Sequence, residues 1–197
     1  MQKSSPTSKL TSKPTRKSQA QGQVRINAGH WRSRIIKFPQ VEGLRPTPDR
    51  VRQTVFNWLG QELTGKNCLD LFAGTGVMGF EALSRNASSV VLVESSRLAL
   101  AALTQNQTLL KAINCKLFFG DALKFLAENK QLFDIVFCDP PYQQQWLDKI
   151  IPVLKPHLTN DALVYFEAEY VLTSNSQFNV IKAGKAGAVY YHLVQFI

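Results

Sequence analysis

The stretch LDLFAGTGVMG, residues 69–79, decides the fold class, because it has the pattern of a buried strand, a glycine-rich turn and the start of a helix. Gly74, Gly76 and Gly79 have the G-x-G-x-x-G spacing, in which glycines permit a tight turn and let a ligand approach the backbone closely. The spacing alone also suits a nicotinamide-dependent oxidoreductase, or a tight turn without a ligand. It predicts a ligand-binding turn at the carboxyl end of a parallel strand.

Strands and helices alternate along the chain around this turn. The expected strands are apolar throughout, which is typical of parallel strands covered by helices on both faces. A glycine-containing segment, residues 183–187, joins the last two strands in an expected hairpin, so one strand should run antiparallel to the others. We expect an α/β fold with a mostly parallel sheet. The expected strands are 67–72, 89–94, 115–119, 133–138, 162–166, 178–182 and 189–196, and the expected helices among them are 78–85, 97–111, 122–128 and 144–154.

An acidic residue in front of the turn indicates the charge of the ligand. Asp70 ends the strand four residues before Gly74, where a carboxylate would repel a pyrophosphate and attract a cation. S-adenosylmethionine carries an ammonium group and a sulfonium group and has no phosphate. We therefore assign Asp70, Phe72, Gly74 and Gly76 to a binding site for S-adenosylmethionine.

Two more acidic residues follow the next expected strands. Glu94 lies 20 residues after Gly74, a spacing at which an acid binds ribose hydroxyls in dinucleotide sites, although a surface position is the alternative. Asp121, with Ala122, follows the third strand. Its side chain can cap the next helix or lie near the adenine amino group, and the sequence does not decide between these roles. We assign Glu94, Asp121 and Ala122 to the cofactor site.

The segment DPPY, residues 139–142, follows a buried strand and indicates the chemistry. Pro140 and Pro141 fix the backbone in an extended path, which directs Asp139 and nearby carbonyl oxygens beyond the strand. The exocyclic amino group of a base is a poor nucleophile because its lone pair is delocalised, and such acceptors can bind its N–H groups as positive charge develops. Tyr142 can stack on the base. We expect these four residues to form the catalytic site, with a simple Pro-Pro turn as the alternative.

Positive charge is concentrated in the first quarter of the chain. Residues 1–52 have a net charge of +10 and residues 53–197 have −1, which together give the +9 of the whole chain. A basic segment on a neutral domain is typical of a polyanion-binding protein, and a solvated charged surface is the alternative. Arg45 and Arg50 can instead bind the carboxylate of the cofactor. The expected RNA-binding residues are Trp31, Arg32, Arg34, Arg45, Arg50 and Arg52.

The chain divides into three expected parts. Residues 1–22 are rich in Ser, Thr, Lys and Gln and are expected to be disordered. Residues 23–47 form an expected basic β-hairpin with a linker, and residues 48–197 form the catalytic domain. Thr47 is the expected N-cap of a helix that starts at Pro48, with Arg50 and Arg52 pointing away from its apolar face.

Together these motifs resemble the RsmD family, bacterial methyltransferases of guanine N2 in small-subunit ribosomal RNA, from about Val24 onward. The resemblance implies a class I methyltransferase fold with a seven-stranded sheet, S-adenosylmethionine as the cofactor, and a 16S rRNA guanine in partly assembled 30S subunits as the target. Ser33 and Gln53 depart from the family pattern, in which glycine and glutamate are usual, so the RNA contacts of the basic segment are less defined. The most specific matching segments are residues 45–47, 49–52, 70–76, 79–85 and 139–142.

Other features limit the classes of function. The three cysteines lie in apolar segments and the three histidines are scattered, so no metal site is expected. No apolar run is long enough to span a membrane and no secretory signal is evident, which indicates a cytoplasmic protein, and nothing requires more than a monomer. A DNA methyltransferase acting on adenine N6 or cytosine N4 is the second hypothesis, because such enzymes use a similar tetrapeptide. An oxidoreductase and a non-catalytic RNA-binding protein rank lower.

Overall fold

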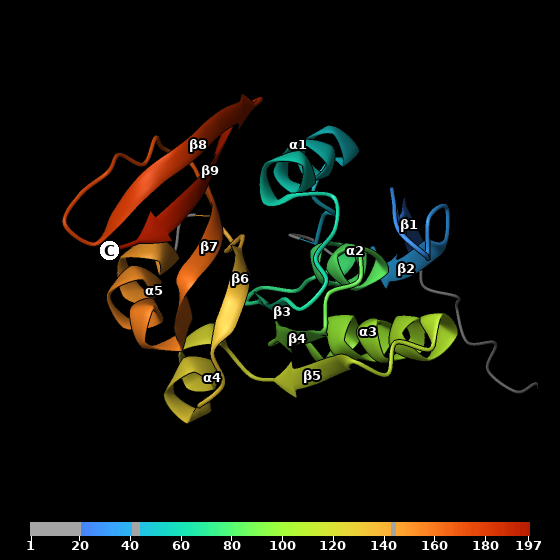
Figure 1. Ribbon diagram of the computed structural model, residues 1–197. Coiled ribbons are helices and arrows are strands. Elements are labelled where there is room, and N and C mark those ends of the chain that lie inside the picture. Colours follow the sequence, from blue (N-terminus) through green and yellow to red (C-terminus); the bar gives the residue numbers. More distant parts are fainter. Residues whose placement is uncertain (1–20, 41–43, 143–144) are drawn as a thin grey trace, which may run out of the picture.

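A computed structural model describes residues 21–40, 44–142 and 145–197, so nearly all of the segment expected to be disordered lies outside the described residues (Figure 1). The main sheet has seven strands in the order β5-β4-β3-β6-β7-β9-β8. All of them run parallel except β9, which is antiparallel to both of its neighbours. This confirms the expected α/β fold. The strands are β3 (Asn67–Asp70), β4 (Ser89–Glu94), β5 (Cys115–Phe119), β6 (Phe133–Cys138), β7 (Leu158–Ala168), β8 (Phe178–Ala186) and β9 (Val189–Phe196).

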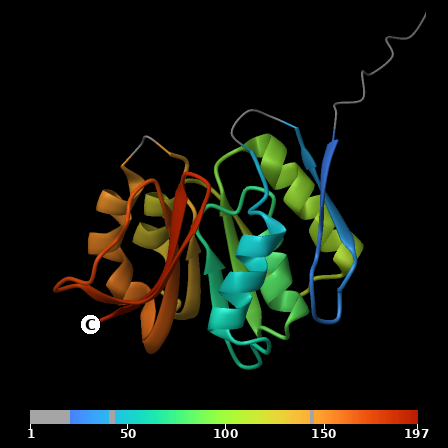
Figure 2. The ribbon, with the colours of Figure 1, turned by 90° about the horizontal axis from the view of Figure 1, so that it is seen from above.

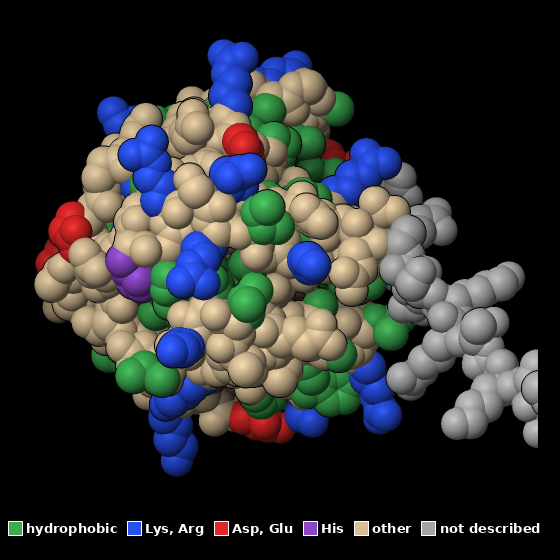
Figure 3. Space-filling view, turned by 90° about the vertical axis from the view of Figure 1, so that its right-hand side faces the viewer, with side chains coloured by type: hydrophobic (Ala, Val, Ile, Leu, Met, Phe, Trp, Pro, Cys, Tyr) green, Lys and Arg blue, Asp and Glu red, His purple; other side chains and the backbone are tan. Residues whose placement is uncertain are grey.

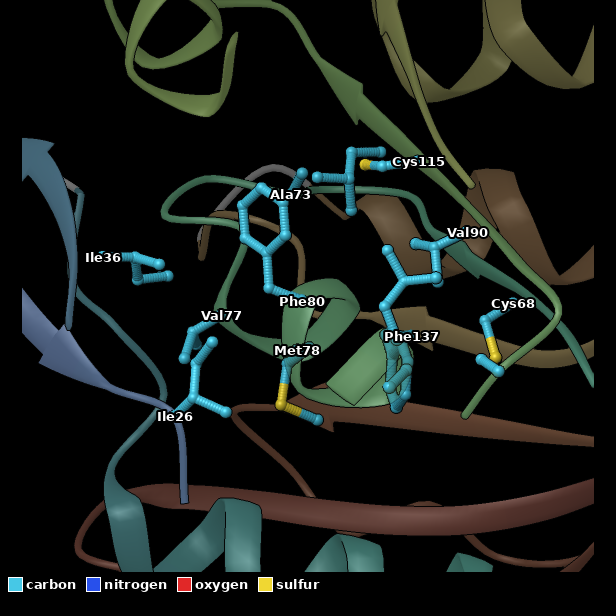
Figure 4. Close-up of a cluster of buried hydrophobic side chains, with 14 of the residues drawn as sticks. Ile26, Ile36, Cys68, Ala73, Val77, Met78, Phe80, Val90, Cys115 and Phe137 are labelled. Atoms are coloured by element: carbon cyan, nitrogen blue, oxygen red, sulfur yellow. The ribbon is translucent and has the colours of Figure 1, made fainter. Parts of the chain in front are cut away.

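Helices cover both faces of the sheet, and each face has its own apolar core. Side chains of α1, α2 and α3 fill the first core, part of which is shown in Figure 4, and side chains of α4 and α5 fill the second. Successive residues of a buried strand enter different cores: Phe137 lies in the first and Val136 in the second. The helices are α1 (Asp49–Leu59), α2 (Val77–Ser84), α3 (Arg97–Leu110), α4 (Ala122–Glu128) and α5 (Trp146–Leu154), followed by a 3₁₀ turn, η1 (Lys155–His157).

The expected N-terminal hairpin is present and packs tightly on the main domain. β1 (Gln21–Arg25) and β2 (Ile35–Pro39) pair antiparallel, and their inward side chains, such as Ile36, belong to the first core. On α3, the buried Asn106 side chain accepts from the backbone N–H of Lys37 at 3.1 Å and donates to its carbonyl oxygen at 2.8 Å. The hairpin turn is bound to the end of α2, where the His30 N–H donates to the Ser84 carbonyl oxygen at 2.8 Å. The hairpin is therefore held as part of the folded body.

The start of α1 differs from the sequence expectation. Pro48 occupies the N-cap position, and no side chain caps the helix by a hydrogen bond. Thr47, the expected N-cap, is buried one residue earlier. Arg52 was expected to point away from the apolar face, which is wrong, because its side chain is completely buried between α1, α2 and the hairpin. The hairpin covers a second side of α1, which helical periodicity alone does not reveal.

A buried ionic cluster ties these three elements together. Glu81 on α2 forms ion pairs with Arg52 at 3.0 Å and with Arg85 at 2.9 Å. Its carboxylate also accepts from the backbone N–H groups of Asn27 and Ala28, at 2.8 and 3.0 Å. Hydrogen bonds and opposite charges thus satisfy a buried carboxylate, as burial of a charge requires.

Candidate active site

The motifs predicted to bind ligands lie together at the carboxyl edge of the parallel strands. In the order β5-β4-β3-β6, the chain leaves β3 toward β4 on one side, whereas β6 lies on its other side. This point, where the direction of strand succession changes, is where open α/β sheets bind ligands. Asp70 is in register with Phe137 of β6, so the end of β3 lies close to the DPPY segment that follows β6.

The glycine-rich turn has the backbone geometry that needs glycine. Gly74 and Gly76 have φ angles of 52° and 77°, in the left-handed region. A Cβ on Gly76 would lie 2.4 Å from a methyl carbon of Leu103 and 2.8 Å from the Phe80 ring, so a larger residue does not fit. The turn therefore packs tightly on α2 and α3 at Gly76, which is buried, whereas Gly74 is partly exposed.

Asp70 holds this turn from beneath. It is only 4% exposed, and its carboxylate accepts hydrogen bonds from the backbone N–H groups of Phe72 and Gly79. Burial, and to a smaller extent the negative charge of Glu94, raise the pKa of Asp70 to about 7, and the two hydrogen bonds oppose this shift. The structure places Asp70 next to the proposed cofactor site, and its direct contact with a cationic ligand stays a prediction.

Glu94 links the glycine turn to the end of β4. Its carboxylate accepts from the N–H of Gly74 at 2.8 Å and from the N–H of Ser96 at 2.6 Å. The side chain is partly exposed, and burial raises the pKa of Glu94 against the effect of these hydrogen bonds. A partly exposed carboxylate at this rim fits the expected contact with ribose hydroxyls.

The end of β5 contributes the next part of the rim. Phe119 is in register with Glu94 and 46% exposed, and the Arg97 guanidinium lies 5.5 Å from the centre of its ring. Asp121 is exposed and caps α4 by accepting from the Lys124 N–H at 2.9 Å. Of the two roles left open for Asp121, the structure shows capping, and the adenine contact stays a prediction. Ala122, the first residue of α4, is buried.

Asp139 follows β6 and lies beside a carboxylate that the sequence analysis missed. Its side chain hydrogen-bonds with Glu167, near the end of β7, and Glu167 also accepts from the Tyr165 hydroxyl at 2.5 Å. Burial, then the negative charges of Glu167 and Asp70, hold the pKa of Asp139 well above its usual range. The signal available in the sequence was an acidic residue directly after an expected apolar strand, residues 162–166.

The other residues of the tetrapeptide have the expected accessibility for a base-binding site. Tyr142 is 44% exposed, as a ring that stacks on a substrate should be, and burial together with nearby acids raises the pKa of its hydroxyl. Pro140 is buried and Pro141 is exposed. Phe72 contacts the ring of Trp146 edge-on, with centroids 5.3 Å apart, and so connects the glycine turn with α5.

The expected RNA-binding residues are divided between two edges of the sheet. Trp31, Arg32 and Arg34 lie in or beside the hairpin turn, which is bound to the end of α2, at the edge opposite Asp139 (Figure 2). Basic side chains are scattered singly over this side of the molecule (Figure 3). Arg45 and Arg50 are exposed, and Arg45 follows Leu44, which lies against Gly74 at the carboxyl edge. Arg52 is buried in the ionic cluster, so its side chain is not available to bind RNA.

The described residues include neither a cluster that could hold a metal ion nor a helix that could span a membrane. Within residues 21–40, 44–142 and 145–197, no set of three or more His, Cys, Asp or Glu side chains is arranged to hold a metal ion. None of the helices in those ranges is long and apolar enough to cross a membrane. Within the part of the chain that the structure describes, the main influences on the pKa values of Asp70, Asp139 and Glu167 include no cationic side chain.

The donor set of this edge fits S-adenosylmethionine. A glycine turn in which Gly74 is partly exposed, a partly exposed carboxylate at Glu94 and a surplus of negative charge suit a ligand with an adenosine and two positive groups. A pyrophosphate would be repelled by the same acids. The sheet topology, the glycine turn and the DPPY segment together define a class I S-adenosylmethionine-dependent methyltransferase.

Comparison with known proteins identifies the family. A family model described as "Conserved hypothetical protein 95" matches residues 24–195. The ribosomal RNA small subunit methyltransferase D of Escherichia coli K12 is 40% identical over 179 residues, which cover 88% of this chain and 90% of that protein. The protein of the same name from Haemophilus influenzae is 39% identical, over 89% of this chain and 95% of its own length. The chain belongs to this family, the RsmD family.

Solved structures agree with this assignment. A putative methyltransferase from Escherichia coli is 42% identical and superposes with a TM-score of 0.79, over 89% of this chain and 98% of that chain. A putative methylase from Haemophilus influenzae is 36% identical, with a TM-score of 0.75, over 88% of this chain and 98% of that one. The expected seven-stranded methyltransferase fold is thereby confirmed.

Proposed function

We propose that the protein transfers a methyl group from S-adenosylmethionine to the exocyclic N2 of a guanine in 16S ribosomal RNA, within 30S subunits or their assembly intermediates. The observation that supports this most strongly is the DPPY segment at the switch point of the sheet, with Asp139 in an acidic environment that suits an amine developing positive charge. The names of the family's relatives support RNA of the small ribosomal subunit as the substrate. They do not favour a DNA substrate or a nicotinamide cofactor.

The residues of the site divide the work of the reaction. Bound S-adenosylmethionine supplies an electrophilic methyl group. The partly exposed backbone at Gly74 accommodates the ligand, the buried Gly76 gives the turn its shape, and Glu94 accepts hydrogen bonds from the ribose hydroxyls of the ligand. Asp139 and the Pro140 carbonyl oxygen accept from the two N–H groups of the target amine and orient its lone pair. Acceptors held rigidly in this way stabilise the positive charge that develops on nitrogen.

The base itself is held by the exposed part of the tetrapeptide. The Tyr142 ring offers a stacking surface beside Asp139, and base–aromatic stacking contributes about 1–3 kcal/mol per base. Arg45 and Arg50 bind phosphates near the target. Trp31, Arg32 and Arg34, at the opposite edge, contact more distant RNA, which a folded ribosomal particle provides and a short oligonucleotide does not. We place the reaction in the cytoplasm, with a monomer as the working unit.

The test is methyl transfer from labelled S-adenosylmethionine to 16S rRNA and 30S subunits that lack native methylation, followed by nucleoside analysis. We expect a single N2-methylguanosine. Asp139→Ala should abolish transfer and leave S-adenosylmethionine binding, measured by calorimetry, nearly intact. Label in N6-methyladenine or N4-methylcytosine, or greater incorporation into duplex DNA than into rRNA, would overturn the substrate.

A further inference from the structure

The register between β6 and β7 places two acidic side chains together at the candidate active site. Cys138 of β6 is paired with Phe166 of β7, and the next residues along the two parallel strands are Asp139 and Glu167. Successive side chains of a strand point to opposite faces, so Asp139 and Glu167 share the face that Phe137 and Tyr165 occupy in the first core. Their side chains hydrogen-bond with each other.

Glu167 is fixed on its remaining sides. It is 6% exposed, and its carboxylate accepts from the hydroxyl of Tyr165, a residue that is fully buried. Tyr191 of β9 is its partner in the sheet, and the Tyr191 ring stacks on Trp58 of α1 at 5.4 Å. Gly184 of β8 lies opposite Tyr191, and a Cβ there would come within 2.4 Å of that ring. Trp58 and Gly184 thus fix the ring of Tyr191, which is the neighbour of Glu167 in the sheet.

Asp139 is the more accessible member of the pair. As a whole residue it is partly exposed at the carboxyl edge, whereas Glu167 is buried. The titratable groups that influence these two carboxyls are Asp70, Tyr165 and each other, and Tyr142 senses both of their charges. Among the described residues, none of the main influences on these two carboxyls is a cation. Two hydrogen-bonded carboxyl groups in such a place share one proton, and the pair then carries a single negative charge.

We propose that Glu167 is a positioning residue for methyl transfer, which orients Asp139 toward the target amine and receives, through Asp139, the proton that the amine loses. This rests on the proposed function. Asp139 accepts from the amine on one oxygen and donates its own proton to Glu167 from the other. The nitrogen lone pair forms the bond to the methyl carbon, and the carbon–sulfur bond breaks with its electrons left on sulfur. One N–H proton then passes to Asp139 while the shared proton passes to Glu167, so the pair becomes neutral.

The test compares Glu167→Gln with Asp161→Asn, the same acid-to-amide change at an exposed position of the same strand. We expect the single-turnover rate of methyl transfer to 30S subunits to fall roughly 100-fold in Glu167→Gln, as loss of a proton acceptor does. S-adenosylmethionine affinity should stay within about twofold, because Glu167 acts on the reacting amine and not on the bound cofactor. Asp161→Asn should match the parent. Tyr165→Phe, which keeps both carboxyls, provides a second variant and should lose less.

A second readout separates this role from simple structural support. With ¹³C-labelled aspartate, the carboxyl resonance of Asp139, assigned with Asp139→Asn, should titrate well above its usual range in the parent. It should move to lower pH in Glu167→Gln, because a negative neighbour is gone. An unchanged rate, or a reduced rate with an unmoved Asp139 titration, would overturn the proposal. If the parent methylates no RNA, the proposed function fails, while the titration still tests the shared proton.

Discussion

Two groups of buried charges lie on the same face of the sheet and are built in opposite ways. Glu81 is flanked by Arg52 and Arg85 and accepts hydrogen bonds from the hairpin backbone, so its charge is balanced. Asp139 and Glu167, with Asp70 nearby, have only acidic and phenolic neighbours among the described groups that influence them. The first group holds three structural elements together. The second retains negative charge at the edge where we propose that the cofactor and the target base bind.

This difference in charge balance separates carboxylates that stabilise the fold from carboxylates that are expected to serve function at a cost in stability. A buried carboxylate with cationic partners keeps the fold in register, and its removal leaves an uncompensated charge. Buried carboxylates without cations raise one another's pKa values and destabilise the protein, so they are expected where a positive ligand or a developing positive charge completes them. The contrast can be tested by removing single charges from each group.

The largest effect on stability is expected in the balanced group. Arg52→Ala leaves Glu81 buried with one cation fewer, which should lower the free energy of unfolding by about 3–5 kcal/mol in urea titrations. The matched control is Arg50→Ala, an exposed arginine on the same helix, which should change it by less than about 0.5 kcal/mol. Equal effects of the two substitutions would remove the distinction between the two groups.

The unbalanced group should respond in activity. Asp139→Asn removes the proton that the pair shares and the group that passes the amine proton to Glu167, and the methyl-transfer rate should fall about 100- to 1,000-fold. Stability in urea should change little, because the amide of the variant can donate to Glu167 in place of the shared proton. A strongly destabilised variant with normal activity per folded molecule would show that Asp139 belongs to the structural type of cluster.

The pH dependence of stability should reveal the unbalanced group as well. Asp70 has its pKa raised from the ordinary 3.8 to about 7, so the folded protein binds more protons than the unfolded chain between these values. Its contribution to stability is therefore greatest below about pH 4 and is lost as the pH rises through 7. Asp70→Asn should gain roughly 1–2 kcal/mol relative to the parent between pH 4.5 and 8, less than the full linkage because the amide has one acceptor oxygen for two N–H groups. A difference that does not change with pH would contradict this assignment.

The smallest effects are expected from arginines outside both groups. Arg45→Ala should weaken RNA binding several-fold and reduce the slope of log affinity against log salt by about one, as loss of one phosphate contact does. Arg32→Ala, at the opposite edge, should behave in this way with 30S subunits and have no effect with a short RNA around the target. Equal effects on the short RNA would place the hairpin turn near the target base.

The sequence predicted the parts of this site that follow from local pattern. The glycine turn, Glu94 and DPPY each follow an apolar strand, so their meeting at the carboxyl edge is a consequence of a parallel sheet. Glu167 escaped notice because its role depends on the register of β7 against β6, which no local pattern specifies. Arg52 was misjudged for a related reason: its partners are a carbonyl oxygen 27 residues earlier and a carboxylate 29 residues later. In both residues the environment of the side chain depends on partners that are distant in the sequence.

The position of β9 has a consequence for how the protein is made. β8 precedes β9 in the chain but joins the main sheet only through it. A ribosome synthesises about 5–20 residues per second from the N-terminus, so β8 emerges before the strand that gives it a place. Tyr191 lies on β9, and until that strand arrives Glu167 lacks its neighbour in the sheet. On the nascent chain the glycine turn can form early. The surroundings of Glu167 are complete only after β9 has left the ribosome.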